Sequence, residues 1–175
     1  MLHPARHDDW SVPAGGLEWD CRSTLEHVLD TLVLYTAHLA TRTDRALPYL
    51  RRGAVEAPVR HLVRNITSAA WVLAGVAEAT PPGTLAYHPA GNSDAEGFCA
   101  MAGDELLVHV NDIAEGLGLR FRPPEDLAGG VLSRLFPSLP PDDDAWATVL
   151  WANGRLERGG ERRPPDWVWQ SSPTG

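Results

Sequence analysis

Cysteine and basic residues are both scarce in this 175-residue chain. The two cysteines, Cys21 and Cys99, lie far apart and form no CxxC pattern. A reduced, cytoplasmic setting therefore fits best, with each thiol serving as a small apolar side chain. Lys and Arg total 15 against 23 Asp and Glu, which gives a net charge of −8. Because nucleic acids and anionic membranes attract clustered positive charge, neither is expected as a partner.

Long apolar segments and familiar catalytic motifs are also absent from the sequence. The longest dense apolar run, AAWVLAGVA at 69–77, is too short to span a bilayer. The first ten residues, MLHPARHDDW, lack the apolar core of an export signal. No GxGxxG, P-loop, GxSxG or HExxH motif occurs, so nucleotide cofactors, hydrolase triads and zincin chemistry have no support. Hydrophobic residues still make up 43% of the chain, which suits one globular domain with a real core.

Proline and glycine divide the chain into segments with helical periodicity. The first helix is expected to begin at Ser23, because Glu26 follows at the spacing of a capping box. Residues 1–22 are expected to form an irregular arm, and about 155–175 an irregular tail whose Trp-Val-Trp sequence is a short strand or a clamp. Helices are expected at 23–42, 57–79, from 93 or 94 to about 116 or 118, at 124–135 and at 142–155. With no set of alternating strands, the prediction is one all-α domain, a helical bundle spanning 1–175.

The third expected helix carries a polar pair in the stretch GDELLVHVND, residues 103–112. On a wheel of about 100° per residue, Glu105, His109 and Asp112 fall on the apolar side. The opposite, solvated side gathers Asp104, Asn111 and Glu115. A buried carboxylate needs a partner or a metal, and Glu and His one turn apart can reach one cation. The alternative is that Glu105 pairs with an Arg or lies at the edge of the apolar side, while His109 is a hydrogen-bonded core histidine.

A metal site needs a third ligand, and His27 in the stretch TLEHVLD is the main candidate. The wheel does not favour it, because His27 falls roughly opposite Leu25, Leu29 and Leu32. It falls instead near Leu34 and His38. It either belongs to a helix that is packed on two sides or is a surface histidine. Weaker candidates are His38, His61 and His88.

The stretches LEWDCRSTLEHVLD and AGDELLVHVNDIAEGLG together resemble the DinB-like metalloprotein superfamily. The closest resemblance is to the branch named after mycothiol-dependent maleylpyruvate isomerase. In that branch a Trp precedes the helix that carries the first metal histidine, and a later helix carries E-x-x-x-H-x-x-D. Here Trp19 lies eight residues before His27, and ELLVHVND supplies Glu105, His109 and Asp112.

This resemblance implies a DinB-like four-helix bundle in which His27, Glu105 and His109 hold a divalent metal, commonly zinc. Three such ligands leave a coordination position open for a thiol cofactor such as mycothiol. The thiolate would act on a small electrophilic substrate by isomerisation, conjugation or thiol transfer. Asp112 would orient a ligand imidazole, the alternative being an exposed acid at the helix end. The implied partners are small molecules, and the protein would be a monomer or a homodimer.

Three departures limit the resemblance, which covers about residues 10–135. The family usually has a helix before the position of Trp10, where only nine residues stand here. The isomerases carry a C-terminal α/β domain that this sequence lacks, which argues against maleylpyruvate itself as substrate. The sequence CAMAGD replaces an Arg that often precedes the glutamate by a turn. A metal- or small-ligand-binding bundle without chemistry therefore remains a second hypothesis, and a purely structural bundle a third.

Overall fold

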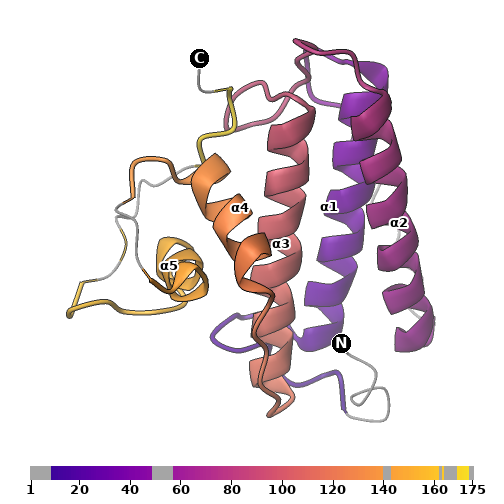
Figure 1. Ribbon diagram of the computed structural model, residues 1–175. Coiled ribbons are helices and arrows are strands. Elements are labelled where there is room, and N and C mark those ends of the chain that lie inside the picture. The colour runs from indigo at the N-terminus through magenta and orange to yellow at the C-terminus, as the bar shows by residue number, and fades with distance from the viewer. Residues whose placement is uncertain (1–8, 49–56, 140–142, 162, 164–168, 174–175) are drawn as a thin grey trace.

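The computed structural model describes residues 9–48, 57–139, 143–161, 163 and 169–173. These residues contain five helices and no strand beyond isolated bridges, so the predicted all-α class is confirmed. The helices are α1 (Cys21–Thr41), α2 (Val59–Ala79), α3 (Ala95–Gly116), α4 (Glu125–Leu135) and α5 (Ala145–Ala152). The long helices α1, α2 and α3 stand side by side, with α1 packed on both others (Figure 1). Helix α4 covers α3, and the short α5 packs on α4.

The start of α1 differs from the expected capping box at Ser23. The N-cap is Asp20, whose extended backbone lets its carboxylate accept a hydrogen bond from the Ser23 N–H at 2.6 Å. The helix therefore begins two residues earlier, and Ser23 lies inside the first turn. The start of α3 was expected at residue 93 or 94, and the structure agrees. Asp94 is the N-cap, and its carboxylate accepts a hydrogen bond from the Gly97 N–H.

Replacing Asp20 with Ala should destabilise the protein by about 0.5–2 kcal/mol, because the first-turn N–H loses its carboxylate acceptor. The Ser23→Ala variant should cost clearly less, since the Asp20 side chain and not the Ser23 hydroxyl forms the cap. Urea unfolding of both variants measures the difference. Equal losses, or a larger loss for Ser23→Ala, would contradict this assignment of the cap.

Helix α3 is buried on two sides, which the helical wheel did not anticipate. Asp104, expected on the solvated side, is 1% exposed and accepts hydrogen bonds from Asn153 Nδ2 at 2.9 Å and Trp169 Nε1 at 3.0 Å. Asn111 is also buried, so the solvated assignment is wrong for both residues and holds only for Glu115. The physical reason is that α4, α5 and the C-terminal residues cover this side of α3.

The described residues that follow α5 form an irregular tail. Helix α5 stops at Ala152, earlier than expected, and Gly154 follows with a positive φ of 72°. Trp169 is not in a strand, and its indole instead fixes the tail to Asp104 on α3. The other tryptophan of the tail, Trp167, lies outside the described residues.

The described part of the N-terminal arm, residues 9–20, contains no helix and packs under the start of α1. Trp10 and Ala14 are buried, and the Cys21 N–H donates to the Val12 carbonyl at 2.9 Å. A Cβ on Gly116 would collide with the Pro13 carbonyl and the Cys21 Sγ, so a residue without a side chain lets the arm cross the end of α3. Among the helices of the described ranges, none combines the length and apolar character that crossing a bilayer requires.

Candidate metal centre

The structure brings His27 from α1 together with Glu105 and His109 from α3. One ligand atom from each residue lies within 4.8 Å of the others. Glu105 Oε2 stands 3.3 Å from His27 Nε2 and 3.2 Å from His109 Nε2. Helix α1 is covered by α2 on one side and by α3 on another. His27 can therefore meet Glu105 of α3 although it does not belong to the leucine side of its helix. The Trp19 ring, 5.1 Å from the His27 ring between centroids, packs against that imidazole from the arm.

The distances and directions around Glu105 fit a metal better than hydrogen bonds. Its Oε2 is buried and makes no hydrogen bond, although two imidazole nitrogens lie within 3.3 Å. Hydrogen bonds between an imidazolium and a carboxylate are usually about 2.7–2.9 Å long. Two ligands of a tetrahedral zinc ion, each about 2.0–2.1 Å from it, stand roughly 3.3 Å apart. The three side chains therefore suit a divalent ion that accepts nitrogen and oxygen donors.

His109 is held in position by Asp112 and Arg155. His109 Nδ1 lies 3.1 Å from Asp112 Oδ2, which leaves Nε2 to face Glu105. The Asp112 carboxylate, 1% exposed, also accepts from Arg155 Nε at 3.2 Å and Arg155 Nη2 at 2.8 Å. A buried carboxylate on the second nitrogen of a ligand histidine fixes its ring orientation and tautomer. Sequence reasoning did not single out Arg155, which lies 43 residues from Asp112 in a turn beyond α5.

The charges of the centre depend on one another. Burial would raise the pKa of Glu105, but His109 and His27 outweigh it and hold that pKa at about 2. Burial would likewise lower the pKa of His109, but Asp112 and Glu105 raise it to about 9. Burial opposes ionisation of Asp112 too, and His109 with Arg155 overcomes it and lowers the pKa of that carboxyl. In the absence of a metal, a protonated His109 therefore lies between two carboxylates at neutral pH.

A cavity of about 500 Å³ opens beside the centre. His27 and Glu105 form part of its wall, and the remainder is largely apolar and aromatic, including Leu34, Tyr35, Tyr87 and Trp169. A binding site for a small molecule is usually a concave, mostly apolar space of this kind, with a few polar groups. Two of the three candidate ligands, His27 and Glu105, therefore have a space next to them in which a reaction partner can bind.

The other candidate histidines lie away from the three-residue centre. His38 and His88 line the cavity, while His61 is exposed on α2. His88 Nε2 lies 3.3 Å from the Tyr35 hydroxyl, and its Nδ1 accepts from the Ala90 N–H at 3.2 Å. Burial, with a contribution from His38, lowers the pKa of His88 to about 4, so its ring is neutral at neutral pH.

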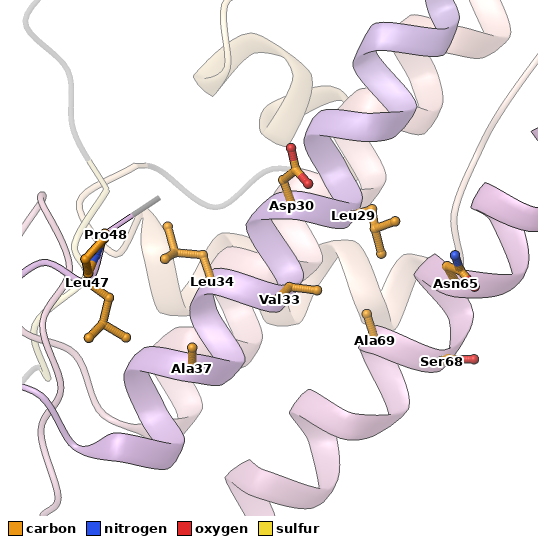
Figure 2. Close-up of a pocket in the computed structure, with 10 residues that line it drawn as sticks. All are labelled: Leu29, Asp30, Val33, Leu34, Ala37, Leu47, Pro48, Asn65, Ser68 and Ala69. Carbon is orange, nitrogen blue, oxygen red and sulfur yellow. The ribbon is translucent and has the colours of Figure 1, made fainter. Parts of the chain in front are cut away.

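A second hollow, of about 540 Å³, lies between α1 and α2 (Figure 2). Its walls include Val33 and Ala37 of α1 and Ala69 of α2, and none of the three candidate ligands. Leu34 of α1 and Leu47, which lies beyond that helix, line both hollows, so the two hollows are neighbours. The hollow that reaches the centre, rather than this one, is the candidate active site.

No family model matches the chain, and no curated protein or solved structure does so either. The interpretation of the centre therefore depends on the chain's own side chains. Within the part of the chain that the structure describes, only one cluster of His, Cys, Asp or Glu has the spacing of a metal site. It consists of His27, Glu105 and His109.

Replacing Arg155 with Gln should weaken zinc binding about 10–100-fold, because Asp112 would then orient His109 less firmly. The substitution removes no metal ligand, so the zinc stoichiometry at saturation should stay at one per chain. Competition with a chromophoric chelator measures the affinity, and Arg120→Gln at an exposed position serves as the matched control. An Arg155→Gln affinity equal to that of the control would show that Arg155 has no positioning role.

Proposed function

We propose that the protein is a divalent-metal-dependent enzyme of the DinB-like type, with zinc held by His27, Glu105 and His109. In this proposal a thiol such as mycothiol acts on a small electrophilic substrate in the cytoplasm, by isomerisation, conjugation or thiol transfer. The observation that carries it is the buried Glu105 Oε2, which has two imidazole nitrogens beside it and no hydrogen bond. The cavity that Glu105 and His27 help to line supplies room for the reactants.

The bound ion would supply Lewis acidity that keeps a thiol ionised at neutral pH. Glu105 contributes the negative charge that attracts the ion, and the Asp112–Arg155 pair fixes the His109 imidazole. Three protein ligands with a further position open are typical of catalytic rather than structural zinc sites. The apolar cavity wall would exclude water from a reactive thiolate, which favours attack on the substrate over side reactions.

Cobalt substitution tests the proposal before any substrate is known. Cobalt(II) takes the ligands of zinc and reports its coordination by visible absorption. Mycothiol added to the cobalt protein should produce a sulfur-to-cobalt charge-transfer band, and His109→Ala protein should show no such band. The matched His61→Ala variant changes an exposed histidine of α2 and should behave like the wild type.

The outcomes separate the proposal from its alternatives. Cobalt binding without any spectral response to thiols would favour a metal- or small-ligand-binding bundle without thiol chemistry. A wild-type protein that binds neither cobalt nor zinc would support a purely structural bundle. Where the thiol band appears, turnover of conjugated and strained electrophiles in the presence of thiol identifies the reaction class.

A further inference from the structure

His38 lines the cavity and carries a buried hydrogen-bond donor. His38 is 2% exposed, and its Nε2 accepts a hydrogen bond from the Leu47 N–H at 3.2 Å. Because Nε2 is the acceptor, the neutral ring carries its proton on Nδ1. That Nδ1 is buried and has no hydrogen-bond partner among the described residues. Buried polar groups are normally paired, so the exception needs an explanation.

The described residues of the cavity wall carry almost no charge away from the metal centre. Glu105 is the one carboxylate among the described residues that line it, and none of them is Arg or Lys. Burial lowers the pKa of His38 and of His88, so both imidazoles are neutral at neutral pH. An anionic ligand would lose its hydration here without gaining a cationic partner from these residues.

The cavity is elongated along α1. His27, Thr31, Tyr35 and His38 all line it, and their spacing of three or four residues places them in one stripe on the helix. His27 and His38 are eleven residues apart, which corresponds to about 16 Å along the helix axis. The metal centre and the His38 donor are therefore at opposite ends of the stripe.

We infer that this cavity binds an elongated, uncharged and largely apolar molecule, with a carbonyl or similar acceptor that receives the His38 Nδ1–H. The inference rests on the proposed function only in placing the other end of the molecule at the metal centre. In that setting the molecule is the electrophilic substrate, and it is a neutral carbonyl compound rather than a carboxylate. Aromatic side chains of the wall, Tyr87 and Trp169 among them, suit a flat or aliphatic body.

Linear hydroxamates test this inference, because they combine a metal-binding head with a variable far end. Three probes of equal length are compared on zinc-loaded protein: one ending in an N-phenyl amide, one in a phenylalkyl group and one in a carboxylate. The amide probe should bind at least tenfold more tightly than the carboxylate probe. The His38→Phe variant should weaken the amide probe about five- to tenfold and leave the phenylalkyl probe unchanged.

Two further measurements make the result specific. His38→Gln offers an amide oxygen to the Leu47 N–H and an amide N–H to the ligand, so it should retain most of the preference for the amide probe. Acetohydroxamate, which reaches only the metal, should bind wild type and both variants equally. Suppose that acetohydroxamate and zinc bind normally but the carboxylate probe binds as well as the amide probe. The inference about the cavity is then wrong, and the proposed metal centre is unaffected. Equal loss of all long probes in His38→Phe would mean that His38 acts only in packing.

If the wild type binds no zinc, the proposed function fails, and the inference is tested separately. The metal-free protein is then titrated with the neutral anilide that lacks the hydroxamate. Binding that His38→Phe weakens would support the neutral cavity on its own. The absence of any binding would overturn it as well.

Discussion

Replacing Glu105 with Gln should lower the affinity of the protein for zinc by more than 100-fold. The amide keeps the shape of the side chain but removes the negative charge between His27 and His109. Substitutions that only disturb the orientation of a ligand already cost about 10–100-fold, so loss of the anionic ligand itself should cost more. Competition with a chromophoric chelator measures this, and Glu96→Gln, an exposed glutamate in the first turn of α3, is the matched control.

Thermal unfolding distinguishes a zinc ligand at Glu105 from a simple ion pair between Glu105 and His109. If zinc is bound, chelation should lower the melting temperature of the wild type and of Glu96→Gln, and leave that of Glu105→Gln almost unchanged. If Glu105 served only as a partner for protonated His109, excess zinc would not stabilise the wild type. A wild-type melting temperature that does not respond to zinc would therefore contradict the metal centre.

The all-α class followed from the sequence, but the surroundings of α3 did not. A helical wheel divides one helix into an apolar and a polar side, and it placed Asp104 and Asn111 on the polar one. Whether that side meets water depends on elements that come later in the chain. Here α4, α5 and Trp169 cover it, and Asp104 is buried with two hydrogen-bond donors. The same reason explains His27, whose side of α1 is covered by a second helix.

The residues of the centre differ in how much local signal they carry. Glu105 and His109 lie one turn apart, so their shared direction follows from helical geometry alone. Arg155 has no comparable signal, because it follows a glycine turn and its contact with Asp112 depends on how α5 packs on the bundle. His38 was only one of the weaker candidate ligands in the sequence. Its missing hydrogen-bond partner depends on the path of Leu47, which periodicity cannot predict.

The pH dependence of zinc binding should have a break at about pH 9, the pKa to which Asp112 and Glu105 raise His109 against the effect of burial. Below that pH the ion must displace a proton from His109, so the apparent association constant should rise by at least about tenfold per pH unit. Glu105 releases no proton in this range, because its pKa is held at about 2. Calorimetry in buffers of different ionisation enthalpy, with chelator-buffered zinc, measures the protons released.

Metal-free and zinc-loaded protein should consequently respond to pH in opposite directions. The raised pKa of His109 stabilises the metal-free fold fully below about pH 6.5, and this contribution is lost as the pH rises through about 9. The metal-free melting temperature should therefore fall over this window. With zinc present it should rise over the same window, because the ion binds more tightly as the proton leaves. Asp112→Asn removes one of the two carboxylates beside His109, so the break in zinc affinity should move toward lower pH. Parallel slopes with and without zinc would mean that the ion binds somewhere other than His109.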